Sequence, residues 1–159
     1  HFADDTYLKC SNKNDRLLKN KINKDLALLF DWLCSNRLSL NVSKTEFIVF
    51  KPPKKKLETR FTLKLNRIVL YESKKIRYLG LIVDDKLSWK FHIYELRKKL
   101  NRVIGIIYRL QKLSCPRSVL LSIYYTLFQS HVMYGLCIWG TANNEYLEEI
   151  RLVQKKQLE

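Results

Sequence analysis

The sequence FADD at residues 2–5 places two adjacent carboxylates, Asp4 and Asp5, among residues that favour short strands. Neighbouring residues of a regular strand point to opposite faces, so the pair can serve one site only where the backbone turns. Small and polar residues suit a tight turn, and we predict a hairpin with both aspartates at its tip. Carboxylate oxygens are ligands that Mg²⁺ prefers, which makes the pair a candidate metal site. A solvated turn or a helix cap is the alternative.

An amphipathic helix is predicted after this hairpin, over residues 15–36. Its apolar residues recur at intervals of three and four, which is the pattern of a helix with one buried face. They are Leu18, Ile22, Leu26, Leu29, Phe30 and Leu33. Most lysines of this segment lie off the apolar stripe, so the opposite face is expected to meet solvent.

Strand patterns follow this helix. Residues 45–50 are rich in β-branched and aromatic side chains, which favours a buried strand. Residues 61–65 and 68–71 favour a hairpin with an Asn-Arg turn, a weaker turn signal than Asn-Gly. A third strand is predicted over residues 76–83. Together these patterns predict an antiparallel sheet with the helix packed on one face.

Helical patterns dominate the second half of the chain. From Ser88 the period of the apolar residues changes from two to 3.6, which predicts a helix over residues 88–113 with Ser88 as its N-cap. Another helix is predicted from about residue 144. Residues 118–141 carry no formal charge, apart from His131 if it is protonated. We predict a buried helix of a small bundle there, and not a membrane span, because polar residues interrupt the segment.

Composition and charge narrow the class of protein. The chain has 159 residues and 47% hydrophobic residues, which excludes a disordered tail. Its net charge of +15 predicts a polyanionic partner, with nucleic acid the first candidate and an anionic membrane surface the second. The four cysteines have no zinc-site spacing and are expected to be reduced, mostly buried thiols of an intracellular protein. The chain begins without Met, inside a predicted strand, and we expect it to be a fragment.

Several stretches, taken in order, resemble one family. FADD at residues 2–5 resembles the aromatic-Ala-Asp-Asp box of reverse transcriptases, and LSLNVSKTEF at residues 38–47 is similar to the next motif in enzymes of non-LTR retrotransposons. YLGLIVD at residues 78–84 resembles the strand that follows. LSW at residues 87–89, followed by His92-Ile93 and by residues 134–140, is similar to the C-terminal extension of Jockey- and CR1-like elements. Each motif is weak alone, but their order is a strong signal.

The resemblance implies the fold and activity of a right-hand polymerase. The expected fold class is α+β, with an antiparallel palm-type sheet and a packed helix in residues 1–85. An all-α, thumb-like helical bundle is expected in residues 86–159. The implied reaction is RNA-directed DNA synthesis, in which a primer 3′-hydroxyl attacks the α-phosphate of a deoxynucleoside triphosphate. Two Mg²⁺ ions are expected to activate the hydroxyl and neutralise the pyrophosphate in the complete enzyme.

The same resemblance implies roles for individual residues. Asp4 is expected to bind the metal, with Asp5 supporting the site beside it. Lys44 is expected to protonate the departing pyrophosphate or to steer the nucleotide, and a surface lysine in a turn is the alternative. Tyr78, Leu79 and Gly80 match the turn that holds the primer end. At Gly80, a simple packing gap is the alternative to a close approach by the primer.

Four basic residues of the predicted 88–113 helix are candidates for contacts with the phosphates of a duplex, because a helix holds them in place: Arg97, Lys98, Lys99 and Arg102. A second acidic pair, Asp84 and Asp85, is predicted to form the turn before this helix and not a catalytic site.

The expected partners are an RNA template, a DNA primer, deoxynucleoside triphosphates and the upstream part of the same polypeptide, with no membrane. The complete element is expected to act in the nucleus. The family's first catalytic aspartate and its fingers do not occur in these residues, so we do not expect the isolated fragment to polymerise. Two alternatives are a non-catalytic, basic nucleic-acid-binding module and a degenerate retroelement relic.

Overall fold

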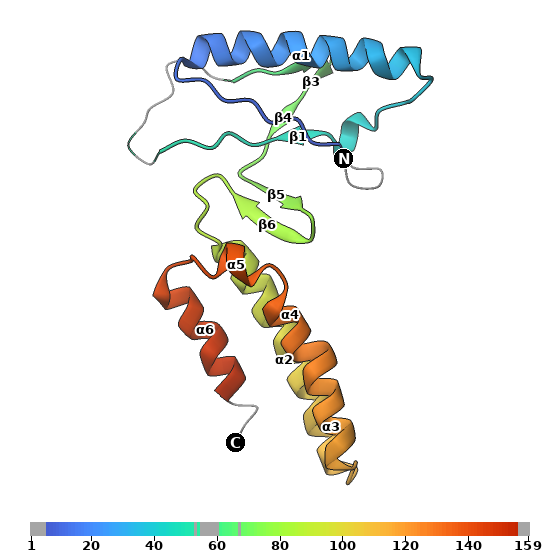
Figure 1. Ribbon diagram of the computed structural model, residues 1–159, viewed down its shortest axis with the longest axis vertical. Coiled ribbons are helices and arrows are strands. Elements are labelled where there is room, and N and C mark those ends of the chain that lie inside the picture. Colours follow the sequence, from blue (N-terminus) through green and yellow to red (C-terminus); the bar gives the residue numbers. More distant parts are fainter. Residues whose placement is uncertain (1–5, 53, 55–60, 67, 156–159) are drawn as a thin grey trace. The chain divides into compact units, whose positions relative to one another are not determined.

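The computed structural model describes residues 6–52, 54, 61–66 and 68–155, in two compact units, His1–Lys74 and Lys75–Glu159 (Figure 1). Helix α1 is followed by short strands in two-stranded ladders and then by the remaining helices, in agreement with the predicted α+β class. The division by compactness falls before residue 75, whereas the predicted palm and thumb meet after residue 85. The assignment of palm and thumb stays a prediction.

The first unit is built on helix α1 (Asp15–Ser35), which confirms the helix predicted there. Its first turn is capped by Asn14, whose side-chain oxygen accepts hydrogen bonds from the backbone N–H groups of Arg16 and Leu17 at 2.9 and 3.1 Å. The buried face of the helix packs against the strand segments of the same unit. The cluster comprises Leu26, Phe61, Leu63, Leu65 and Leu70, with Leu18, Ile22 and Phe30 partly buried against it.

Two ladders lie beside α1 in this unit. Strands β2 (Lys64–Leu65) and β3 (Ile68–Val69) pair antiparallel, which confirms the predicted hairpin. Strand β1 (Glu46–Phe47) follows the 3₁₀ helix η1 (Val42–Lys44) and pairs parallel with β4 (Tyr71–Glu72).

The prediction of a purely antiparallel sheet is therefore wrong for one ladder. The physical reason is that residues 68–72 pair with two partners in succession. Leu70 still donates its backbone N–H to the carbonyl of Leu63 at 2.9 Å, on the side of β2. Ser73 then donates to Phe47 at 2.8 Å, on the side of β1, which runs in the same direction as β4.

The second unit begins with a hairpin where a single strand was predicted over residues 76–83. Strands β5 (Lys75–Tyr78) and β6 (Leu81–Asp84) pair antiparallel around Leu79 and Gly80. Both central residues have positive φ angles, +46° and +78°, as a tight two-residue hairpin turn requires. The reversal was missed because leucine is not a residue that favours such a turn.

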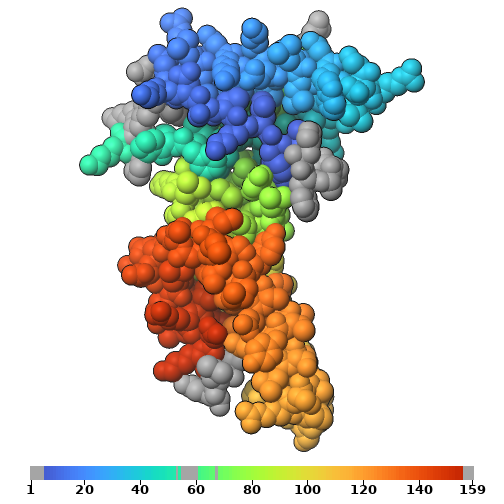
Figure 2. Space-filling model, viewed as in Figure 1, coloured from blue at the N-terminus to red at the C-terminus, as the bar shows by residue number. Residues whose placement is uncertain are grey.

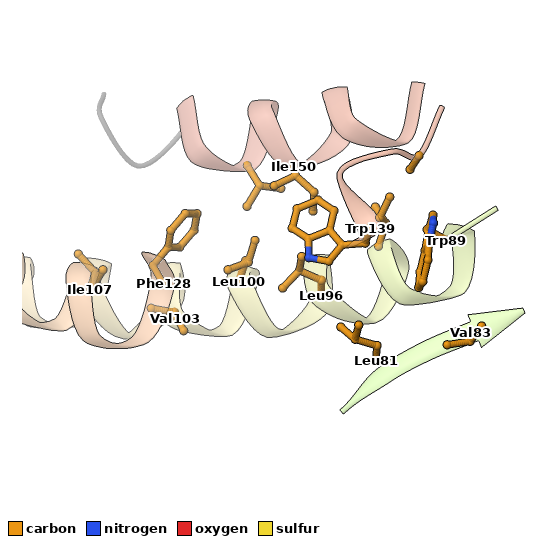
Figure 3. Packing of buried hydrophobic residues seen from close by; sticks show 13 residues of the cluster. Leu81, Val83, Trp89, Leu96, Leu100, Val103, Ile107, Phe128, Trp139 and Ile150 are labelled. Atoms are coloured by element: carbon orange, nitrogen blue, oxygen red, sulfur yellow. The ribbon is translucent and has the colours of Figure 1, made fainter. Parts of the chain in front are cut away.

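Helix α2 (Lys90–Lys112) carries the core of the second unit. Its predicted apolar stripe is largely confirmed, with buried Ile93, Leu96, Leu100, Val103 and Ile107. These side chains pack against Leu81 and Val83 of β6 and against later helices (Figure 3). The helix is capped by Trp89 and not by Ser88, because the buried Asp84 draws the backbone into a tight turn there.

Most of the uncharged segment forms one helical rod over residues 117–133, and the helix ends there. Helices α3 (Arg117–Ile123), η2 (Tyr124–Gln129) and α4 (Ser130–Met133) follow one another with helical backbone at each junction, and η2 is a π-helical turn. The rod, orange in Figure 2, forms part of the surface of its unit and packs on α2 through the fully buried Phe128. The prediction of a buried helix is therefore wrong: Phe128 is the one buried residue of α3, η2 and α4, and Tyr125 and Met133 are 59% and 57% exposed. The rod ends at Met133, and Gly135, with φ +65°, follows where the chain changes direction.

Two short elements complete the second unit, α5 (Leu136–Trp139) and α6 (Asn144–Lys155), and α6 confirms the helix predicted from residue 144. Hydroxyl groups of the rod donate to carbonyls of the preceding turn; Thr126, for example, donates to Ser122 at 2.7 Å. Among the described residues, none of the helices combines the length and the apolar character that crossing a membrane requires.

Candidate functional site

Asp4 and Asp5 lie outside the described residues, so their role as metal ligands stays a prediction. The arm that follows them, residues 6–10, forms no strand in the described part of the chain. Across the described ranges, no group of three or more His, Cys, Asp or Glu side chains could hold a metal ion. The cysteines there are unpaired thiols, and two of them, Cys34 and Cys137, are exposed where burial was expected.

Lys44 ends the 3₁₀ helix η1, and its side chain is exposed. Asn41 shapes this turn in two ways. Its carbonyl accepts the backbone N–H of Lys44 at 3.1 Å and the hydroxyl of Thr45 at 3.0 Å. Its side-chain oxygen accepts the hydroxyl of Ser43 at 2.6 Å. Asn41 thus stabilises the turn that carries Lys44, a role that its place in the LSLNVSKTEF stretch could have signalled.

The predicted primer-end turn is the tip of the β5–β6 hairpin. Tyr78 and Leu79 are 38% and 37% exposed there. The backbone carbonyl of Leu79 accepts a hydrogen bond from the Tyr134 hydroxyl at 2.6 Å. A Cβ atom on Gly80 would lie 3.3 Å from Cε1 of Tyr134. The close approach at Gly80 is therefore made by a tyrosine ring of the same unit.

The four basic candidates on α2 fall into two pairs. Arg97 and Lys98 are engaged with acidic side chains: Arg97 Nη1 lies 2.7 Å from Glu149 Oε2 of α6, and Lys98 Nζ lies 3.2 Å from Glu95 Oε1. Lys99 and Arg102 are exposed, and neither forms an ion pair with another described residue. Lys99 and Arg102 are thus the pair most available to an external phosphate.

Exposed aromatic rings accompany the basic residues of α2, a feature that the sequence reading missed. Lys98 Nζ lies 4.3 Å from the ring centre of Tyr94, and Lys112 Nζ lies 4.6 Å from that of Tyr108. Lys75 of β5 lies 4.8 Å from the ring centre of Phe91. A cation is attracted to the face of an aromatic ring. A surface that combines cations with aromatic rings suits nucleic acid, whose phosphates are negative and whose bases stack on the rings. The signal was the i, i+4 spacing of Tyr and Lys along the helix.

Asp84 is a buried carboxylate with a structural task, as predicted for the acidic pair. It is 2% exposed and accepts backbone N–H bonds from Lys86, Ser88 and Trp89 at 3.1, 3.1 and 3.0 Å. The hydroxyl of Ser88 donates to it at 3.2 Å. These donors compensate the burial of the charge and connect the end of β6 to the start of α2.

His92 is buried between Trp89 and Trp139, at centroid distances of 6.5 and 6.0 Å. Its Nδ1 accepts the backbone N–H of Ile82 at 3.4 Å, and its Nε2 has no hydrogen-bond partner among the described residues. Burial, and to a lesser extent the positive charge of Lys99, lowers the pKa of His92 below its ordinary value. The imidazole therefore acts as a neutral core group.

The structure brings these residues together only within each unit. Asn41 and Lys44 lie in the first unit, and the hairpin turn, α2 and Tyr134 lie in the second. Each group of residues is held in place by contacts within its own unit.

Comparison with known proteins identifies relatives that match nearly the whole chain. This chain is 26% identical over 161 residues to "RNA-directed DNA polymerase from mobile element jockey" of Drosophila melanogaster, and the match covers 99% of this chain and 17% of that protein. It is 25% identical over 160 residues to "Probable RNA-directed DNA polymerase from transposon X-element" of the same organism, with 98% and 17% covered. A third relative, 25% identical over 161 residues, is "Putative 115 kDa protein in type-1 retrotransposable element R1DM" of the same organism, with 99% and 15% covered.

The chain thus spans 17% of the length of the first two relatives. No protein-family model matches it, and no solved structure gives a significant match. The resemblance found in the motifs is confirmed: the relatives that match nearly the whole chain are named as RNA-directed DNA polymerases of the jockey and X-element non-LTR retrotransposons and as a protein of the R1DM type-1 retrotransposable element.

Proposed function

We propose that this chain is a segment of an RNA-directed DNA polymerase of a jockey-like non-LTR retrotransposon. The observation that carries the proposal is the match to the jockey and X-element polymerases over 99% and 98% of the chain. The motifs from FADD to residues 134–140 occur in the order that such a polymerase requires. Because the relatives are much longer, the other parts of the polymerase are assigned to the rest of the complete polypeptide.

The proposed reaction is the attack of a primer 3′-hydroxyl on the α-phosphate of a deoxynucleoside triphosphate, directed by an RNA template. Asp4 and Asp5 would hold Mg²⁺, two ions in the complete enzyme. A bound ion would supply positive charge to the attacking and departing oxygens. Lys44, exposed at the end of η1, would neutralise or protonate the departing pyrophosphate.

The proposed palm covers residues 1–85 and the proposed thumb residues 86–159. In this assignment α2 lies along the primer–template duplex. Lys99 and Arg102, which are exposed and have no ion-pair partner among the described residues, contact its phosphates. Such contacts position a duplex without reading its sequence, as a polymerase that copies any template requires. Tyr78, Leu79 and Gly80 contact the primer end.

The test is Asp4→Asn in the complete polypeptide. Loss of one ligand charge should abolish nucleotide addition and leave the affinity for duplex within about twofold, because no proposed duplex contact is changed. Primer extension and duplex binding are measured on the same preparations. Asp31→Asn, an exposed aspartate of α1, is the matched control and should extend normally. Full extension by Asp4→Asn would remove Asp4 from the mechanism. The isolated 159-residue chain should bind duplex without extending it.

A non-catalytic nucleic-acid-binding module is the second candidate. It is favoured by α2, where exposed cations and aromatic rings share one helix. This alternative predicts duplex binding by the complete polypeptide with no extension by the unsubstituted protein. The same pair of assays therefore separates the two candidates.

A further inference from the structure

The β5–β6 turn contains a residue that does not favour its own conformation. Leu79 has φ +46°, in the left-handed region that glycine, asparagine and aspartate favour. A bulky side chain there is strained, and such a conformation persists only where the surroundings hold it. The second turn residue, Gly80 at φ +78°, is suited to its conformation. The structure must therefore hold Leu79 from outside the turn.

The support comes from Tyr134, 55 residues farther along the chain. Its hydroxyl donates to the carbonyl of Leu79 at 2.6 Å, and its ring lies where a Cβ on Gly80 would come within 3.3 Å. The next residue, Gly135, approaches the hairpin equally closely, because a Cβ there would lie 2.9 Å from Cδ2 of Leu81. The end of the rod and the hairpin turn thus fit into each other.

Tyr134 is itself fixed to the core. Its backbone carbonyl accepts a hydrogen bond from Nε1 of Trp139 at 2.9 Å. The indole is 1% exposed and packs among Leu96, Leu100 and Ile150 (Figure 3). A continuous set of contacts therefore runs from the core through Tyr134 to the carbonyl of Leu79.

The held turn exposes a defined surface. Since the Leu79 carbonyl is already bonded, the turn offers the exposed side chains of Tyr78 and Leu79. An aromatic ring and an aliphatic side chain suit contacts with the base and sugar of one nucleotide. That combination favours a terminal nucleotide over a run of phosphates.

We propose that Tyr134 is a positioning residue, which holds the Leu79–Gly80 turn so that its tip contacts the 3′-terminal nucleotide of the primer. This inference rests on the proposed function, which assigns the primer end to residues 78–80. Tyr134 does not touch the nucleotide; it acts through the backbone of the turn.

The experiment uses the complete polypeptide and a DNA primer annealed to an RNA template, with a photo-cross-linkable 4-thiothymidine as the 3′-terminal nucleotide. Tyr134→Phe removes the hydroxyl and keeps the ring that packs on Gly80. Tyr125→Phe is the matched control, since Tyr125 is exposed on η2 of the same rod. Three quantities are measured: cross-linking to the peptide that contains residues 78–80, overall duplex affinity, and primer extension.

Tyr134→Phe should lower this cross-linking by about threefold to tenfold, the usual effect of losing one hydrogen bond, and leave duplex affinity within about twofold. Tyr125→Phe should cross-link as the unsubstituted protein does. Amide exchange at Gly80 and Leu81 should accelerate in Tyr134→Phe alone, which shows that the turn has loosened.

The two proposals fail in different ways. Absence of extension by the unsubstituted protein would refute the proposed polymerase activity. Extension with equal cross-linking by Tyr134→Phe would refute the positioning role alone. Cross-linking of the unsubstituted protein only outside residues 78–80 would also refute it, since the turn would then not meet the primer end.

Discussion

At the scale of single residues, His92 couples the stability of the second unit to pH. Its pKa is lowered in the folded state, so between that value and about 6.5 the unfolded chain binds more protons than the folded chain. The contribution of His92 to stability is therefore fully present above about pH 6.5 and decreases as the pH falls through this window. Below the folded-state pKa it changes no further.

Denaturant unfolding of the chain at pH 7.5 and pH 5.5 measures this effect. His92→Gln should reduce the difference between the two unfolding free energies, and His131→Gln, a change at an exposed position, should preserve it. An unaltered pH difference in His92→Gln would assign the effect to other groups.

Single residues also show which features could be predicted from the sequence and which could not. The turn role of Asp84 could be predicted from its place before a helix, because turns and caps are local. The ion pair of Arg97 could not, since Glu149 lies 52 residues away. The helical periodicity places Arg97 off the apolar stripe and so predicts that its side chain is exposed. It cannot predict whether the guanidinium pairs with a carboxylate of the same chain or with a phosphate of a nucleic acid. Asp4 and Asp5 stay predictions based on the motif.

At the scale of one element, α2 offers a test of which cations meet nucleic acid. Each phosphate contact with a B-form duplex contributes about 0.9 to the slope of log affinity against log salt. Replacing Lys99 and Arg102 together by Ala should therefore reduce the magnitude of the slope by about 1.8, twice that contribution. The measurement is a salt titration of the 159-residue chain with a DNA duplex.

Arg97→Ala is the matched control on the same helix. It removes the ion pair with Glu149 and should leave the slope nearly unchanged. A loss of about 0.9 in the slope for Arg97→Ala, half of that expected for the double variant, would mean that Arg97 exchanges its carboxylate for a phosphate on binding.

Some helices and strands could be predicted from the sequence and others could not. The reason is the sequence separation of the residues whose contacts form them. The helices α1, α2 and α6 were predicted because their apolar periodicity is encoded within a few residues. The β5–β6 turn accepts a hydrogen bond from Tyr134, 55 residues farther along the chain, and the parallel β1–β4 pair joins segments 25 residues apart, as in Glu46 with Tyr71. Neither contact leaves a local pattern in the sequence.

At the scale of the whole molecule, the chain has two hydrophobic clusters with no residue in common. The first unit holds Lys44 and the second holds the hairpin turn and α2. The change of period near Ser88 predicted two units, and β5 and β6, which have strand patterns, pack with α2 in the second of them.

The uneven distribution of tryptophan between these units makes each one separately visible by intrinsic fluorescence. Trp32 on α1 is 51% exposed, whereas Trp89 and Trp139 in the second unit are 7% and 1% exposed. In Trp32→Phe, emission should come only from the second unit, at shorter wavelength and with little quenching by iodide. Its guanidinium titration should then report the second unit alone, while far-ultraviolet circular dichroism also follows α1. Coincident curves would show that the two units unfold together, and separate midpoints would give each unit its own stability.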